Sequence, residues 1–237
     1  MSDQKAFSVT EDFESTGSII FAKHAVSARR IGANQHADGD FTAVSCRRAK
    51  WADCFAETGR IPAAVMVEHG WHFDCCGCGV RIDYDLSHWQ DRVHRDDTIR
   101  GMLAQARRYR RWTPADIIGY QNTAVFCDQL CKDTHDAFEA ERNRRQNHAI
   151  EVFKARVLKR FPGVEFRDRP HAYATMDKGR WRLRQVAVAF DFPGMEHGPA
   201  HYRWDAESTY RKAEKPHFTC CNGDREAFEA FAKVTAL

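Results

Sequence analysis

The sequence predicts an α+β protein, and three observations lead to this fold class. From Asp128 to about Phe161 the chain contains neither glycine nor proline, and apolar residues recur near helical spacing, which indicates one long helix. After Pro162-Gly163 the apolar residues begin to alternate, which predicts strands, and Asp224 is expected to cap a final helix. We therefore expect a small antiparallel sheet packed on the long helix or on the last one.

The composition is that of a soluble globular chain. Its 237 residues are 43% hydrophobic and 29% charged, enough for one or two cores. The longest apolar runs, such as 19–22 and 186–190, are far shorter than the roughly 18 to 20 residues of a membrane span. The N-terminus is polar and lacks the pattern of a secretory signal. We expect a cytoplasmic protein that does not bind a membrane, and no pattern indicates an oligomeric state.

Turn residues and apolar spacing predict the remaining elements. In the first half we expect a strand over 41–46, a helix over 48–57 and a short helix from Pro62 to near Gly70. A further helix begins at Asp96-Asp97, because apolar residues follow it at helical spacing. The other expected elements are a helical turn at Thr113-Pro114, a strand over 122–126, and strands over 164–176, 182–192 and 200–205.

Four of the nine cysteines form two pairs with the spacing of zinc ligands. Cys75 and Cys78 form a Cys-x-x-Cys turn, which presents two thiolates, and Gly79 can take the positive φ that turns backbone amides toward the sulfurs. Cys127 and Cys131 are four residues apart on one face at the start of the predicted long helix, where free N–H groups favour thiolates. The odd number of cysteines argues against a disulfide framework. We expect one structural Zn²⁺ held by these four residues.

Alternatives to this ligand set remain open. Cys76 competes with Cys75 for the first position, and His135 competes for the fourth. A further alternative is that the four paired cysteines bind no metal and are free thiols buried in a core. Among those outside the two pairs, we expect Cys46 and Cys54 to be small core residues, whereas Cys220 and Cys221 are either reactive thiols or part of a second metal site.

The two cysteine pairs also carry a resemblance to a known family. A glycine-containing knuckle, a connecting segment and Phe-Cys-x-x-x-Cys at the start of a helix resemble the treble-clef zinc fingers of the FCS, MYM and TRASH type. The resemblance covers about 60 residues, and the 48 residues between the pairs exceed the usual spacing. The segment 71–79 is also similar to zinc-containing proteins of proteobacterial phages and prophages. The resemblance implies structural zinc and contacts with nucleic acid or protein, with Cys75, Cys78, Cys127 and Cys131 as ligands and Gly79 as the knuckle glycine.

A cluster of arginines lies between the cysteine pairs. Residues 75–161 carry 16 basic and 12 acidic side chains, a weak excess of positive charge. Arginines with aromatic neighbours can follow phosphates while the rings stack on bases, although a solvated helix face has the same pattern. The candidate nucleic-acid-binding residues are Arg100, Arg107, Arg108 and Arg111, with Tyr109 and Trp112 beside them. The same ambiguity holds for Arg142, Arg144 and Arg145 on the long helix, and for Trp181, Arg182, Arg184 and Trp204 in the sheet.

The sequence favours a protein without catalytic activity. It has no phosphate-binding glycine loop, no nucleophile elbow, no zinc-protease motif and no dinucleotide fingerprint. Four thiolate ligands would also leave no open position on the zinc for water. The main challenger is an HNH-like nuclease, whose candidate metal-binding and catalytic residues are His88, Asp91, His94, Asp96 and Asp97.

These observations predict three regions and one favoured function. Residues 1–40 form a segment of uncertain order, 41–161 a treble-clef-like zinc-binding domain with a basic helical insertion and the long helix, and 162–237 a C-terminal α+β domain. The favoured function is a zinc-binding accessory protein in which the four-cysteine site supports nucleic-acid binding by the basic helix. One alternative is a protein-interaction module, or an inhibitor of host machinery if the chain is phage-encoded. The other is a metal-dependent nuclease of the HNH type.

Overall fold

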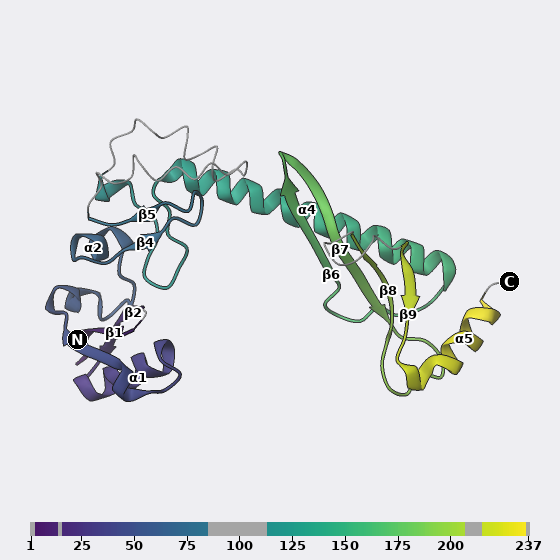
Figure 1. Cartoon of the computed structure of the whole chain (residues 1–237), viewed down its shortest axis with the longest axis horizontal. Coiled ribbons are helices and arrows are strands. Elements are labelled where there is room, and N and C mark those ends of the chain that lie inside the picture. The colour runs from purple at the N-terminus through teal and green to yellow at the C-terminus, as the bar shows by residue number, and fades with distance from the viewer. Residues whose placement is uncertain (1–2, 14–15, 85–112, 207–214, 236–237) are drawn as a thin grey trace. The chain divides into compact units, whose positions relative to one another are not determined.

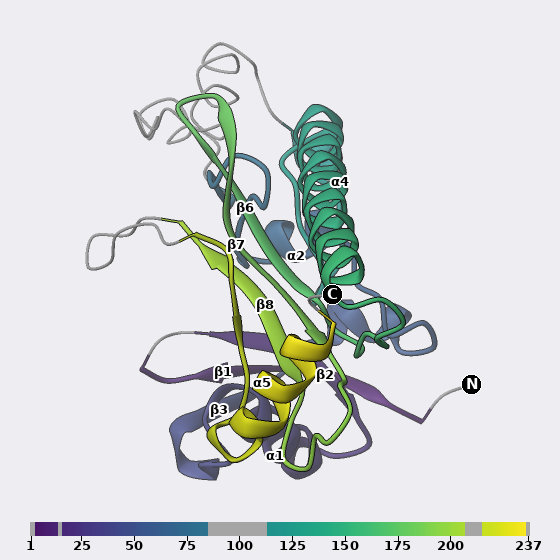
Figure 2. The ribbon, with the colours of Figure 1, turned by 90° about the vertical axis from the view of Figure 1, so that its right-hand side faces the viewer.

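The computed structural model describes residues 3–13, 16–84, 113–206 and 215–235. Among these residues, contacts divide the chain into two compact units: the N-terminal unit ends at Thr134 and the C-terminal unit begins at His135. The division falls inside one continuous helix, α4 (Gln129–Arg160), which confirms the predicted long helix (Figures 1 and 2). It differs from the boundaries expected at residues 40 and 161. The fold is α+β with antiparallel sheets, as expected.

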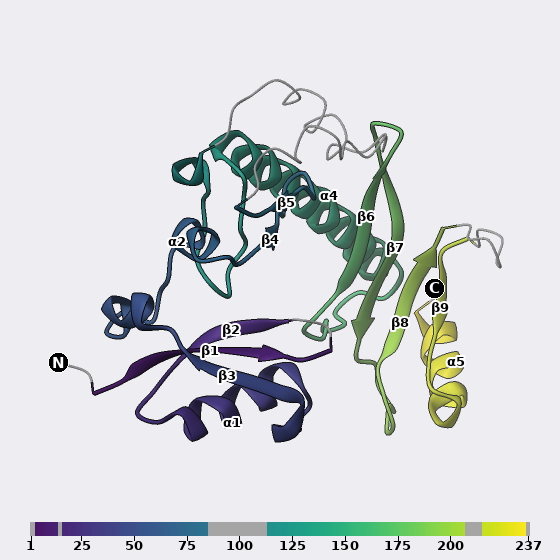
Figure 3. The same cartoon turned by 60° about the vertical axis from the view of Figure 1, so that its left-hand side comes forward.

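The N-terminal unit begins with a three-stranded antiparallel sheet of order β2-β1-β3, with helix α1 against one face (Figure 3). The approach is close at Gly32 of α1, where a Cβ atom would lie 2.3 Å from a methyl carbon of Val9. The opposite face packs on a second cluster that includes Ile19, Ile61 and Met66. The elements are β1 (Lys5–Glu11), β2 (Gly17–Ala22), α1 (Ala25–His36) and β3 (Val44–Arg48).

This sheet corrects the expectation that residues 1–40 have uncertain order. Strand β2 is buried on both faces, with Ile20 in one cluster and Ile19 in the other, so it lacks the alternation of polar and apolar residues by which a strand is recognised. The strand expected over 41–46 is instead a 3₁₀ turn at 41–43 followed by β3, and the helix expected over 48–57 is a 3₁₀ helix at 50–55. Asp53 ties this segment to β1 and β3, because its Oδ1 accepts from the Ala6 N–H at 2.9 Å while the carboxylate pairs with Arg48.

The C-terminal unit contains a four-stranded antiparallel sheet of order β6-β7-β8-β9. The strands expected over 164–176, 182–192 and 200–205 correspond to the first three, with shifted bounds, whereas the three-residue β9 was not expected. The strand expected over 122–126 is absent, because only Phe126 pairs there, with Ile118. The elements are β6 (His171–Asp177), β7 (Arg180–Phe190), β8 (Ala200–Asp205), β9 (His217–Thr219) and α5 (Arg225–Val234).

Phe161 lies in the core of the C-terminal unit and is 1% exposed. Its ring contacts Phe190 of β7, Phe218 of β9 and Phe231 of α5, with centroids 5.7, 5.1 and 4.9 Å away. Helices α4 and α5 share one core with the sheet, so the sheet packs on both helices and not on only one of the two candidates. None of the described helices is long and apolar enough to cross a membrane.

Strand β7 contains a bulge that changes which side chains face helix α4. Tyr173 of β6 pairs with Gln185, but the next residue, Ala174, pairs with Leu183, so Arg184 is the extra residue. Without the bulge, Leu183 would lie on the sheet face opposite Val186, because neighbouring strand positions alternate. The bulge places Leu183 in the same apolar cluster as Val186.

Asp224 precedes α5, where the sequence predicts a helix cap, but its side chain makes no capping hydrogen bond. The buried carboxylate instead accepts hydrogen bonds from the backbone N–H groups of Glu196, His197 and Gly198, at 2.9, 3.0 and 2.9 Å. The bond from Glu196 is the largest cause that lowers the pKa of Asp224. Asp224 therefore holds the loop between β7 and β8 against the start of α5.

Candidate metal centre

The sulfur atoms of Cys75, Cys78, Cys127 and Cys131 all lie within 4.8 Å of one another, and all four residues are buried. Cys127 Sγ is 3.5 Å from that of Cys75, 3.7 Å from that of Cys78 and 3.4 Å from that of Cys131. A tetrahedral zinc with bonds of about 2.3 Å sets its sulfur ligands about 3.8 Å apart. The spacing therefore suits a metal ion.

The first cysteine pair lies in a tight turn between two short strands, β4 (Phe73–Asp74) and β5 (Arg81–Ile82), which pair antiparallel. The Cys75 N–H donates to the Val80 carbonyl at 2.8 Å, and the Gly79 N–H donates to the Cys75 carbonyl at 2.7 Å. Gly79 has a φ of +73°, as expected for the knuckle glycine. The Cys78 N–H then points at Cys75 Sγ, 3.5 Å away.

Gly77 is a second glycine that the knuckle requires, and sequence reasoning gave it no role. A Cβ atom at this position would lie 3.0 Å from both the carbonyl oxygen and Sγ of Cys131. The close approach brings the knuckle against the first turn of α4. The only sequence signal was the position of Gly77 inside the Cys-x-x-Cys motif.

The second cysteine pair lies at the start of α4 and is positioned by Asp128. The buried carboxylate of Asp128 accepts a hydrogen bond from the Cys131 N–H at 2.7 Å, the contact of a helix N-cap. Sequence reasoning did not give Asp128 this role, although an aspartate directly before a predicted helix is a capping signal. One residue earlier, the Cys127 N–H donates to Cys75 Sγ at 3.4 Å.

The electrostatics of the cluster favour a thiolate at Cys75. Its sulfur accepts two backbone N–H groups, and contact with the Cys127 side chain is the largest cause that lowers the pKa of Cys75. The pKa of Cys127 is raised, chiefly by contact with Cys131. Four thiols this close cannot all ionise while their charges repel, and a divalent cation removes that obstacle.

An apolar layer encloses the sulfur atoms. It contains Ala63 and Val67 of helix α2 (Ala63–Glu68), which confirms the short helix predicted from Pro62. The segment that leads into Cys127 is held by backbone bonds: Ile118 and Phe126 exchange N–H and carbonyl contacts at 2.9 and 2.8 Å. The helical turn expected at Thr113-Pro114, which precedes this segment, is present as a 3₁₀ helix at 114–116.

The structure separates the alternative ligands from the four-sulfur cluster. Cys76 is half-buried and His135 lies beside Asp136, with nitrogen and oxygen 3.6 Å apart, and neither joins the group. Cys54 is exposed, which corrects its assignment to a core, whereas Cys46 packs partly buried against the N-terminal sheet. Within the described ranges, Cys220 and Cys221 join no metal-binding group.

Several predicted site residues lie outside the described residues. They are the basic cluster Arg100, Arg107, Arg108 and Arg111 and the nuclease candidates His88, Asp91, His94, Asp96 and Asp97.

Comparison with known proteins adds no relative: no family model, no curated protein and no solved structure matches the chain. The class of site is therefore defined by its geometry alone. It is a buried cluster of four cysteines, compatible with a zinc ion.

Proposed function

We propose that the chain binds one structural Zn²⁺ through Cys75, Cys78, Cys127 and Cys131, in a site of the treble-clef type, and that the zinc supports binding of nucleic acid by the arginines between the two pairs. The zinc proposal rests on the convergence of four buried sulfur atoms from two segments that are distant in sequence. The arginines are Arg100, Arg107, Arg108 and Arg111.

A structural role fits this donor set better than a catalytic one. Zinc in structural sites is held by four protein ligands, whereas catalytic zinc keeps one position for water. Here four sulfur atoms complete the tetrahedron. The apolar layer around the cluster also keeps water away from the metal.

The zinc would close the segment that contains the arginines. Cys78 and Cys127 flank 48 residues, and joining the two ends through a metal offsets the entropy of closing so long a loop. The segment then starts and ends at fixed points. Guanidinium groups on it contact phosphates, and each contact releases counterions from the nucleic acid.

The test measures the affinity of the zinc-loaded full chain for single-stranded and duplex DNA and RNA at two salt concentrations. We expect binding that weakens steeply with salt, and the Arg107→Ala/Arg111→Ala variant should reduce the salt slope by roughly 0.7 to 0.9 per lost contact. Arg30→Ala/Arg47→Ala is the matched control, because both side chains are exposed in the N-terminal unit and the change in charge is equal.

Two results would overturn the nucleic-acid proposal. Absence of binding to every nucleic acid at low salt would favour the protein-interaction module. Metal-dependent cleavage of DNA that disappears in both His88→Ala and His94→Ala proteins, while their zinc content stays normal, would favour the nuclease.

A further inference from the structure

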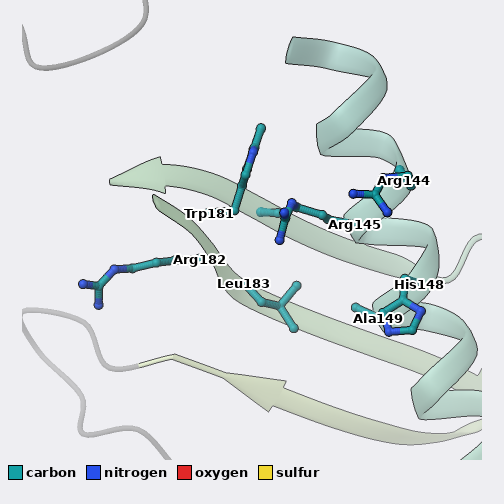
Figure 4. Close-up of a pocket in the computed structure, with 8 residues that line it drawn as sticks. Arg144, Arg145, His148, Ala149, Trp181, Arg182 and Leu183 are labelled. Atoms are coloured by element: carbon teal, nitrogen blue, oxygen red, sulfur yellow. The ribbon is translucent and has the colours of Figure 1, made fainter. Parts of the chain in front are cut away.

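The C-terminal unit contains a groove of about 410 Å³ between helix α4 and the β6–β7 hairpin (Figure 4). Arg144, Arg145 and His148 line it from α4, and Trp181, Arg182 and Leu183 line it from β7. The volume falls in the range of roughly 300 to 1,000 Å³ that is typical of small-molecule sites. No cysteine takes part, so this groove is separate from the candidate metal centre.

The bulge in β7 creates one wall of the groove. Trp181 and Leu183 lie on the sheet face that packs on α4, because Leu183 joins the core cluster and the ring of Trp181 contacts α4. Trp181 is only half-buried, and its ring packs against Phe138 of α4 with centroids 4.7 Å apart. This tryptophan therefore lies at the edge of the core, where one part of the indole remains accessible.

The opposite wall carries more positive than negative charge. Arg144 and Arg145 share a single carboxylate, that of Glu141, through contacts of 2.8 and 2.5 Å. Arg145 uses Nε for this bond, and within the described part of the chain its two Nη groups donate no hydrogen bond. Its guanidinium carbon lies 5.8 Å from the centre of the Trp181 ring. The ion pair with Glu141 thus holds the Arg145 guanidinium beside the Trp181 indole, and its Nη groups remain available to donate to a ligand.

This combination suits a ligand with a flat ring and a negative charge. A guanidinium fork binds phosphate oxygens in pairs, and both indole and guanidinium planes stack on nucleobases. Leu183 and Ala149 give the floor an apolar character that a base can cover. We propose that the groove binds a nucleotide unit, with its base against Trp181 and its phosphate on Arg144 and Arg145.

A nucleotide unit can come from a free mononucleotide or from a single strand, and the test has an arm for each. Calorimetry with UMP and AMP measures the first, and fluorescence anisotropy with a labelled 12-residue oligonucleotide measures the second. The oligonucleotide arm uses full-length protein that carries Arg107→Ala/Arg111→Ala, so that failure of the groove is distinguished from failure of the basic segment. Inorganic phosphate is a third probe.

We expect Arg145→Gln and Trp181→Leu each to weaken binding about tenfold, the effect of losing one stacking or charged contact. Trp181→Phe should retain most of the affinity and shows whether Trp181→Leu fails through folding. Arg180→Gln is the matched control, because Arg180 neighbours Trp181 on the same strand and loses the same charge, but it is exposed and does not line the groove.

Three results would overturn the proposal. The first is absence of binding to both mononucleotides and the oligonucleotide. The second is equal affinity in the wild-type, Arg145→Gln and Trp181→Leu proteins. The third is binding of inorganic phosphate as tightly as UMP, which would show an anion site without recognition of the base.

Discussion

The backbone N–H of Cys127 donates to the sulfur of Cys75 at 3.4 Å, although 52 positions separate the two residues. The Cys78 N–H reaches the same sulfur from within the knuckle. Backbone donors from both segments therefore converge on one sulfur, and such donors stabilise a thiolate. The backbone, and not only the four side chains, builds the candidate metal centre.

Loss of one sulfur ligand should disrupt the N-terminal unit. We expect Cys127→Ser to abolish tight zinc binding and to lower the free energy of unfolding by about 4 kcal/mol or more, because loss of a structural metal is among the largest effects of a point change. The half-buried Cys76 provides the control: Cys76→Ser should change stability by less than about 1 kcal/mol and leave zinc bound. Urea unfolding with zinc analysis of both proteins checks this.

Gly77 is expected to tolerate no side chain. In Gly77→Ala the added carbon meets the backbone oxygen and Sγ of Cys131 at 3.0 Å, so the knuckle must move away from α4. We expect the free energy of unfolding to fall by about 1 to 3 kcal/mol, the usual cost of overpacking, together with weaker zinc binding. Gly198→Ala is the matched change, because a Cβ atom there meets nothing within 4 Å. Equal stability of the two variants would contradict the proposed close packing.

Asp128 should act on the metal through Cys131. Asp128→Ala removes the acceptor for the Cys131 N–H. We expect the change to lower the free energy of unfolding by about 0.5 to 2 kcal/mol and to weaken zinc binding. Asp128→Asn keeps an acceptor oxygen at the same place and should restore most of both properties. A competition assay with a zinc-binding dye measures the affinity. Full zinc affinity in Asp128→Ala would show that the cap does not position the ligand.

The bonds to Asp224 should make the loop between β7 and β8 sensitive to acid. The pKa of this carboxyl is lower in the folded chain than the usual value of about 3.9, so its contribution to stability is present above that value and is lost as the pH falls through the folded pKa. We expect hydrogen exchange of residues 196–198 to accelerate in that range. In Asp224→Asn the protection should be lower at pH 7 and should depend less on pH below about 4.

The features that could be predicted from sequence are those whose signal is local. Cys75 and Cys78 show the spacing of metal ligands within four residues, and α4 is predicted by a run without glycine or proline in which apolar residues recur near helical spacing. The features that were missed depend on distant partners. The N–H groups that donate to the Asp224 carboxylate are 26 to 28 positions away in sequence. The sheet face on which Trp181 lies depends on a bulge that only the pairing with β6 defines.

Strands buried on both faces were also missed. In β2, Ile20 faces the α1 side and Ile19 the other cluster, so polar and apolar residues do not alternate. The contacts of Ile61 and Met66 with that second face link segments that are far apart in sequence. Periodicity within one strand carries no information about such contacts.

The central claim is that Cys75, Cys78, Cys127 and Cys131 hold one zinc ion. The most direct test is elemental analysis of the full chain purified without added metal, beside the Cys127→Ser protein. We predict about one zinc per wild-type chain and little or none in the variant. A wild-type chain that is folded and contains no zinc, or a Cys127→Ser chain that retains a full equivalent, would contradict the account.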